Sequence, residues 1–309
     1  MDPVRYRILG TAQALRPDGT PVPVGGARLR ALLTVLALRA GRTVPVSLLV
    51  DEVWDGASPA DAPGALQALV GRLRRALGAD AIASAEGGYR LACPSDDVDL
   101  HRFERLTGEG VRALADGDPA KAAVTLDDAL ALWQGPALAD LPDRTAEAAR
   151  WEARRLDALR ARHTAALALG HAEQSLPELT ALCDTHPLDE PLQSLRLRAL
   201  RAAGRTAEAL AAFETVRQLL ADRLGTDPGP ELRALYGELL HPEELGERGN
   251  GRARHDGGPG EIGRGEPHDG RYTARNPAEQ PTTPHGSTAP APVPVPVPHA
   301  SPSSPTQST

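Results

Sequence analysis

The chain has 309 residues, two cysteines and a formal net charge of −7. This length allows two domains and a further segment, while Cys93 and Cys183 are too few for a disulfide framework and fit no metal-site spacing. The longest apolar stretch, residues 31–38, is too short to span a bilayer, and the first ten residues contain no apolar signal core. We therefore expect a cytoplasmic protein with no membrane partner.

The charge is unevenly distributed along the chain. Residues 1–95 carry a net charge of +3, residues 96–240 carry −8, and the remainder carries −2. A polyanion would prefer the N-terminal third. The overall negative charge therefore does not exclude a nucleic-acid partner.

The N-terminal third has the sequence signals of a small sheet followed by three helices and a hairpin. The expected strands are residues 4–10, 11–16 and 21–26, with an Asp-Gly turn at 17–20. The expected helices are residues 27–40, residues 47–54 with Ser47 as N-cap, and residues 62–77 with Gly78 as C-cap. A glycine turn at 86–88 then joins strands at 81–85 and 89–93. This order of elements is typical of a winged helix-turn-helix domain, in which the third helix reads DNA and the hairpin is the wing.

The third helix has one apolar face and one outward basic face. Its apolar stripe is formed by Leu66, Leu69, Val70, Leu73 and Leu77. The opposite face holds Ala68, Gly71, Arg72 and Arg75, flanked by Gln67 and Arg74. Small neighbours let a helix enter a groove deeply, and an arginine there reaches guanine O6 and N7 or a phosphate.

Two interpretations of these arginines are open. Taken alone, they indicate a solvated face that pairs with Asp61 or Asp80, whereas their place in a winged-helix order favours DNA contact. We predict seven DNA-binding residues: Gln67, Ala68, Gly71, Arg72, Arg74, Arg75 and Arg90. Arg72 and Arg75 would contact bases or phosphates, and Arg74 and Arg90 the DNA backbone.

Residues 96–242 are alanine- and leucine-rich with helical periodicity. Gly170 and Gly204 lie 34 residues apart in similar segments, and Gly117 begins a weaker copy. A 34-residue period is typical of tetratricopeptide repeats, which stack helix pairs and bind partners on a concave face. Residues 243–309 are rich in Gly, Pro, Ser and Thr, which predicts a disordered spacer. The fold class is therefore mainly α, with domains at 1–95 and 96–242 and a tail at 243–309.

The combined motifs resemble a known family. The segments LLVDEVW, LQALVGRLRRALG and EGGYRL resemble the OmpR/PhoB-type winged helix of the Streptomyces antibiotic regulatory proteins, and ALALWQGPALADL and GTDPGPELRALY resemble their bacterial transcriptional activation domain. The resemblance implies an activator of antibiotic or other secondary-metabolite gene clusters. It implies binding to direct repeats in promoter DNA by side-by-side protomers and recruitment of RNA polymerase. Arg72 matches a base-reading position, and Gly71 stands where related helices often carry Ser, Tyr or Arg.

Enzymatic and metal-site patterns do not occur in the sequence. There is no GxxxxGK[ST] nucleotide loop and no HExxH spacing, so we expect no enzyme activity, cofactor or metal. Cys183 is expected to be a buried thiol, and His171 and His186 to lie on the repeat surface. Two rival functions remain: a repeat-type protein-interaction adaptor, and a regulator gated by a small ligand. Trp133 and Trp151 could line a pocket for such a ligand, although core packing is favoured.

Overall fold

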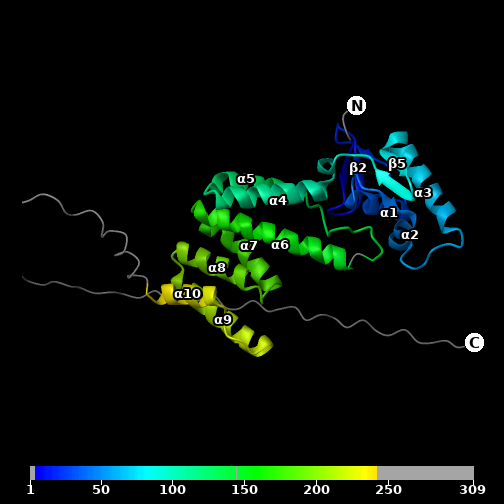
Figure 1. Ribbon diagram of the computed structural model, residues 1–309. Helices are drawn as coiled ribbons and strands as arrows, with labels where there is room; N and C mark the ends of the chain where they lie inside the picture. The colour runs from blue at the N-terminus through cyan, green and yellow to red at the C-terminus, as the bar shows by residue number, and fades with distance from the viewer. Residues whose placement is uncertain (1–3, 144, 242–309) are drawn as a thin grey trace, which may run out of the picture. The chain divides into compact units, whose positions relative to one another are not determined.

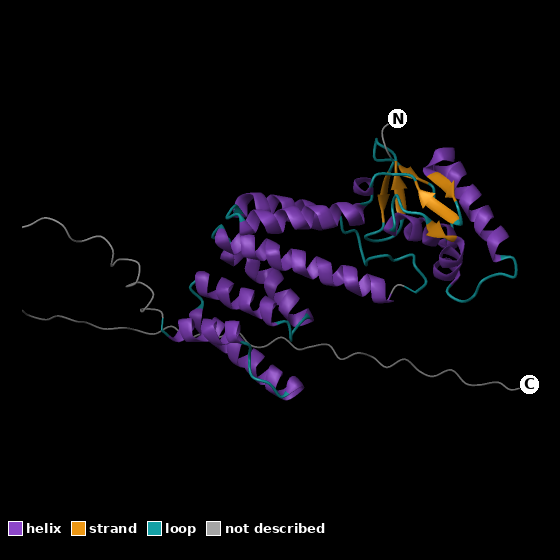
Figure 2. Ribbon diagram, in the orientation of Figure 1, coloured by secondary structure: helices purple, strands orange, loops and turns teal. Residues whose placement is uncertain are grey.

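The computed structural model describes residues 4–143 and 145–241. Two small sheets and three helices come first, and a run of antiparallel helices follows (Figures 1 and 2). The expected fold class is confirmed. The predicted disordered tail, residues 243–309, lies outside the described residues.

The N-terminal elements form the expected winged helix. One antiparallel sheet has the order β1-β2-β3, and a second has the order β4-β6-β5. The strands are β1 (Arg5–Arg7), β2 (Gln13–Leu15), β3 (Pro21–Val22), β4 (Val44–Pro45), β5 (Ile82–Ala85) and β6 (Gly88–Leu91). The helices are α1 (Ala27–Leu38), α2 (Val46–Trp54) and α3 (Ala62–Leu77). The bounds of α3 and its C-cap at Gly78 are as predicted.

The start of α2 differs from the prediction. Ser47 is not the N-cap, because Val44 and Pro45 form β4 and pair with Tyr89 and Gly88 of β6. The helix begins directly after this strand, so Pro45 occupies the cap position in an extended conformation. The sequence gives no strand signal for a two-residue segment whose partner lies more than 40 residues away.

The remaining helices pack against one another in chain order. They are α4 (Asp99–Ala115), α5 (Pro119–Leu130), α6 (Thr145–Ala168), α7 (Ala172–Thr185), α8 (Glu190–Ala202), α9 (Thr206–Leu224) and α10 (Pro230–Leu240). Gly117, Gly170 and Gly204 each turn the chain between two paired helices with φ of 79°, 81° and 74°. These values lie in the left-handed region that glycine adopts without strain. The three copies of the predicted repeat therefore share one turn geometry, as a tetratricopeptide-like domain requires.

Two hydrophobic cores are formed by the residues that the structure describes. The first runs from Tyr6 to Ala165 and so includes both the winged helix and the first helices that follow it. The second is formed by α7 to α10. Trp133 packs edge-on against Phe103 with ring centroids 5.4 Å apart, and Trp151 is also buried. Both tryptophans belong to the first core. Their burial favours core packing over the ligand-pocket interpretation. Cys183 is buried in the second core, as expected.

A polar seam joins the winged helix to the helical domain. The carboxylate of Asp99 at the start of α4 accepts hydrogen bonds from the backbone N–H groups of Ile8 (2.9 Å) and Leu9 (3.1 Å). Asp140 accepts one from the N–H of Ala12 at 2.7 Å and pairs with Arg30 at 2.6 Å. These contacts satisfy backbone groups of the segment that follows β1, which has no strand partner there. Burial raises the pKa of the Asp99 carboxyl to about 6, although the N–H donors act in the opposite direction.

Candidate nucleic-acid interface

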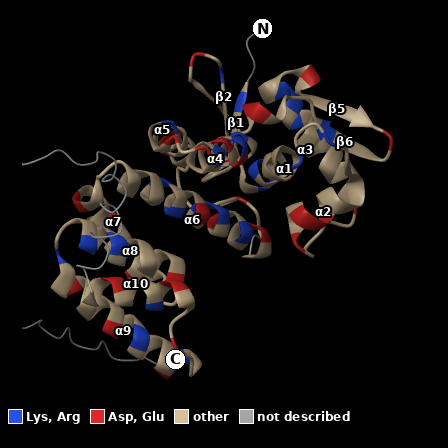
Figure 3. Ribbon diagram, turned by 60° about the vertical axis from the view of Figure 1, so that its left-hand side comes forward, with Lys and Arg blue, Asp and Glu red and all other residues tan. Residues whose placement is uncertain are grey.

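Helix α3 presents the outward face that its sequence predicts. Leu66, Leu69, Val70 and Leu73 are buried, and Leu77 is half-buried. The exposed side chains are Gln67, Ala68, Arg72 and Arg75, and Gly71 lies between them half-buried. Figure 3 shows the basic positions of α3 next to the β5–β6 hairpin. Asp61 begins the helix by accepting a hydrogen bond from the Gly64 N–H at 3.0 Å.

Among the described residues, Arg72 and Arg75 have no carboxylate partner. One Nη of Arg72 lies 3.4 Å from the Gly25 carbonyl oxygen, and Nε of Arg75 donates to the Gly71 carbonyl oxygen at 3.3 Å within the same helix. Pairing with Asp61 or Asp80 is therefore wrong for both: neither aspartate forms an ion pair within residues 4–143 and 145–241. Both guanidinium groups keep N–H donors available to an anionic partner.

Arg74 occupies a different environment. It is half-buried, and its Nε donates to the Ile82 carbonyl oxygen while Nη2 donates to Ser84 Oγ, both at 2.9 Å. Its guanidinium carbon also lies 6.0 Å from the centre of the Tyr89 ring. Arg74 therefore connects α3 to the hairpin, and the structure does not bring it together with Arg72 and Arg75. No periodicity in the sequence could have indicated these contacts, because they depend on how the hairpin docks.

The hairpin places Arg90 on an exposed strand position. Arg90 lies in β6 opposite Ala83 of β5. A side chain on Gly88 would collide with β4, because a Cβ there would lie 2.0 Å from the Val44 carbonyl oxygen. Glycine at this position therefore allows the hairpin to dock against β4, and this docking fixes the strand that carries Arg90.

Gly71 lies in the middle of the exposed face without a packing constraint. A Cβ built on Gly71 meets no heavy atom within 4 Å. Glycine in a helix interior lowers stability by about 1 kcal/mol relative to alanine, so neither packing nor helix propensity accounts for it. The backbone at Gly71 is therefore open on the outward side of the helix.

The described residues contain neither a candidate metal site nor a membrane-spanning helix. Within residues 4–143 and 145–241, no group of three or more His, Cys, Asp or Glu side chains could hold a metal ion. No helix in the same ranges is both long and apolar enough to cross a membrane. His171 and His186 are exposed, as expected.

Two family models match the chain. One described as a bacterial transcriptional activator domain matches residues 98–240, and one described as the C-terminal part of a transcriptional regulatory protein matches residues 24–91. The two matches lie on either side of the predicted domain boundary at residue 95.

Curated proteins and a solved structure are similar over most of the chain. Regulatory protein DnrI of Streptomyces peucetius is 38% identical over 240 residues, which cover 73% of this chain and 88% of DnrI. Regulatory protein AfsR of Streptomyces griseus is 38% identical over 245 residues, which cover 79% of this chain and 25% of AfsR. This chain therefore spans about a quarter of the length of that relative.

The structural comparison agrees with the sequence comparisons. The structure of Mycobacterium tuberculosis EmbR in complex with a low-affinity phosphopeptide has a TM-score of 0.73 and 36% identity, covering 77% of this chain and 65% of EmbR. The fold of both domains and the similarity to these proteins agree with the family resemblance of the sequence motifs. The chain belongs to the family of Streptomyces antibiotic regulatory proteins, which are transcriptional regulators and not enzymes.

Proposed function

We propose that this regulator binds double-stranded promoter DNA through α3 and activates a gene cluster for an antibiotic or another secondary metabolite. The observation that carries the proposal is the pair Arg72 and Arg75, exposed on one helix face without a carboxylate partner. Unpaired arginines at a helix surface are suited to bidentate contacts with guanine or phosphate. DNA is the polyanion whose major groove a winged helix enters with its third helix.

The residues of this face have distinct proposed roles. Arg72 reads a base edge and Arg75 contacts a base or a phosphate, while Gln67 lies at the edge of the same face. Ala68 and Gly71 let the helix enter the groove deeply. Arg90 of the hairpin contacts the DNA backbone.

Arg74 has a positioning role in this proposal. Two of its nitrogens already donate to the hairpin. It therefore holds the hairpin against α3, and the contact to the DNA backbone comes from Arg90.

The helical domain supplies the protein contacts. Its net charge of −8 makes it a poor surface for DNA. The proposed partners of the helical domain are therefore RNA polymerase and a neighbouring protomer. Two protomers lie side by side on direct repeats in the cytoplasm, at the nucleoid. The seam at Asp99 and Asp140 transmits a contact made on the helical domain to the winged helix.

The test is selection of bound duplexes from a random pool, followed by gel shifts on the selected site. Replacing Arg72 by Ala should cost about 1–3 kcal/mol of binding free energy and relax preference at one base position. Arg223→Ala, at an exposed arginine in the last turn of α9, is the matched control for loss of one charge. A phosphate contact would instead weaken all sequences alike and reduce the salt dependence. Equal affinities of wild type and Arg72→Ala for selected and scrambled DNA would reject Arg72 as a reader.

The distance between two DNA half-sites tests the proposed side-by-side arrangement of protomers. Inserting about 5 base pairs, half a turn of B-DNA, between two selected half-sites should move the protomers to opposite faces and abolish cooperative binding. Binding that is equally cooperative at every spacing would contradict side-by-side protomers. An adaptor would instead capture protein partners without DNA and show no salt-dependent binding to the selected site.

A further inference from the structure

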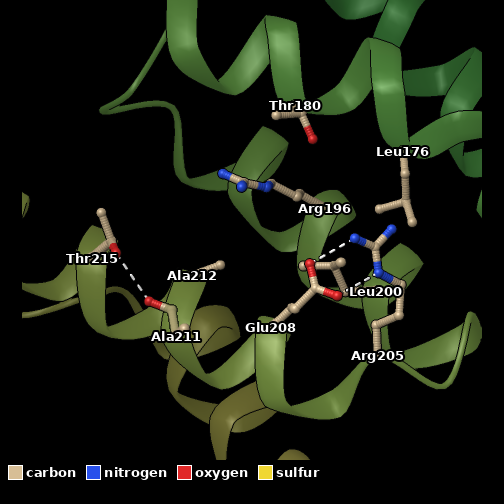
Figure 4. A pocket seen from close by; sticks show the side chains of 9 residues that line it. All are labelled: Leu176, Thr180, Arg196, Leu200, Arg205, Glu208, Ala211, Ala212 and Thr215. Atoms are coloured by element: carbon tan, nitrogen blue, oxygen red, sulfur yellow. Dashed lines mark hydrogen bonds and ion pairs between the residues drawn. The ribbon is translucent and has the colours of Figure 1, made fainter. Parts of the chain in front are cut away.

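A pocket of about 400 Å³ lies between α7, α8 and α9, remote in sequence from the arginines of α3. This volume is in the range of about 300–1,000 Å³ that is common for small-ligand sites. Its lining residues are shown in Figure 4: Leu176, Thr180, Arg196, Leu200, Arg205, Glu208, Ala211, Ala212 and Thr215. Leu176 and Leu200 are 5% and 4% exposed, so part of the wall belongs to the second core.

Arg196 is the charged residue of this pocket whose guanidinium has no counter-ion within reach among the described residues. Within residues 4–143 and 145–241 it forms no hydrogen bond or ion pair, and its Nε is buried without a partner. Figure 4 accordingly shows no interaction from its guanidinium. A buried donor without a partner is costly, and native structures usually satisfy such groups with protein, water or a bound ligand.

Two other cavities between the helices contain arginines that already form ion pairs. The cavity between α5, α6 and α7 contains Arg162, which donates to both Asp127 and Glu178. The cavity lined by α6 and α7 contains Arg155, which is paired with Glu152 and lies 4.9 Å from the Trp133 ring centre. Buried nitrogens without a hydrogen-bond partner also occur in these cavities, at Arg155 Nε and in the His163 ring. The difference lies in the ion pairs, which Arg155 and Arg162 form and Arg196 does not, within residues 4–143 and 145–241.

The charges of the pocket indicate the ligand class. Arg205, the N-cap of α9, and Glu208 in its first turn form a bidentate ion pair with N–O distances of 2.7 and 2.6 Å. Because these two charges cancel, the pocket has a net charge of +1 from Arg196. One carboxylate neutralises it, whereas a doubly charged phosphate would leave an excess charge close to Glu208.

We propose that this pocket binds a carboxylate attached to an apolar group. The carboxylate pairs with the guanidinium of Arg196 in a bidentate arrangement. The apolar group packs against Leu176, Leu200 and Ala212. A small organic acid and an acidic peptide segment of a partner share this chemistry, and the experiment separates the two sources.

The experiment follows the methyl NMR signals of Leu176 and Leu200 in the full chain during titration. The probes are sodium hexanoate and the capped tripeptide Leu-Glu-Leu, with hexanamide and capped Leu-Gln-Leu as neutral matches. We expect saturable shifts with at least one acid and none with its neutral match. A response to hexanoate identifies a small acid as a sufficient ligand, and a response to the peptide alone identifies a protein segment.

Three variants locate the binding. Arg196→Met should weaken binding at least about tenfold, because it removes a charged hydrogen-bonding partner and keeps the length of the side chain. Ala211→Leu fills the pocket from an exposed helix position without changing its charge, and should also weaken binding. Arg198→Met removes a charge from the same helix outside the pocket and should have no effect.

The proposal is overturned if neither acid shifts these signals, if the neutral matches act equally, or if Arg196→Met and Arg198→Met bind alike. No DNA is present in this titration. Its failure is therefore distinguishable from failure of the proposed DNA binding.

Discussion

Replacing Asp140 by alanine should weaken the seam between the winged helix and the helical domain. The Asp140 carboxylate accepts a hydrogen bond from the Ala12 N–H at 2.7 Å and pairs with Arg30 at 2.6 Å. Loss of a hydrogen bond to a charged acceptor costs about 1.5–3 kcal/mol. The ion pair adds about 0.5–1 kcal/mol, because the Arg30 side chain is 30% exposed and partly screened by solvent.

The free energy of unfolding should therefore fall by about 2–4 kcal/mol, a large part of the stability of a typical domain. Urea unfolding measures the global effect. Hydrogen exchange measures the local effect, since the Ala12 N–H should lose protection before the amides of the core. Asp128→Ala is the matched control, because Asp128 is exposed and has no side-chain partner within residues 4–143 and 145–241.

Two results would refute this reasoning. One is a loss of stability in Asp140→Ala no larger than in Asp128→Ala. The other is unchanged protection of the Ala12 N–H. Either would mean that the first hydrophobic core alone joins the two domains and that the polar seam adds no stability.

Three further predictions concern α3 and the seam. Arg74→Met should lower the unfolding free energy by about 1–2 kcal/mol, because its hydrogen bonds to the hairpin are lost. Arg75→Met should change the unfolding free energy by no more than about 0.5 kcal/mol and weaken DNA binding in a gel shift. The reverse pattern would contradict the proposed roles. Gly71→Ala should raise the unfolding free energy by up to about 1 kcal/mol and weaken DNA binding, and unchanged affinity would show that close approach to the backbone is not used. Burial raises the pKa of Asp99 from 3.8 to about 6, so the folded state holds the proton more tightly and the contribution of Asp99 to stability falls as pH rises from about 4 to about 6. Asp99→Asn should remove this contribution, which amounts to about 2 kcal/mol between pH 4 and pH 7, from urea unfolding compared at these two pH values. Equal pH dependence of the two proteins would contradict the shift.

Local sequence signals were sufficient for α3. The apolar spacing of Leu66, Leu69, Val70 and Leu73 defines the buried face, and Gly78 ends the helix with a positive φ that glycine accepts. These signals act within one or two helical turns, so they can be read from a single segment. The outward direction of Arg72 and Arg75 follows from the same spacing.

Contacts between distant segments were not predictable in this way. Arg74 lies beside the apolar stripe like Gln67, but it is half-buried and Gln67 is exposed. The difference arises because the hairpin covers only one side of α3, and that side depends on β6 pairing with β4. An arginine next to a stripe can therefore be assigned to solvent, to DNA or to the protein only when the neighbouring element is known.

The seam between the winged helix and the helical domain also could not be predicted from local sequence signals. Composition and charge change near residue 95, and this change predicts a boundary between two modules. Packing does not follow it, because Leu36 of α1 and Phe103 of α4 belong to one hydrophobic core. Asp99 and Asp140 then bond to backbone groups 91 and 128 residues away. The face proposed to contact DNA and the domain proposed to contact polymerase thus share one folded unit. Destabilising the seam should therefore reduce transcription activation even where the affinity of α3 for a single site is retained.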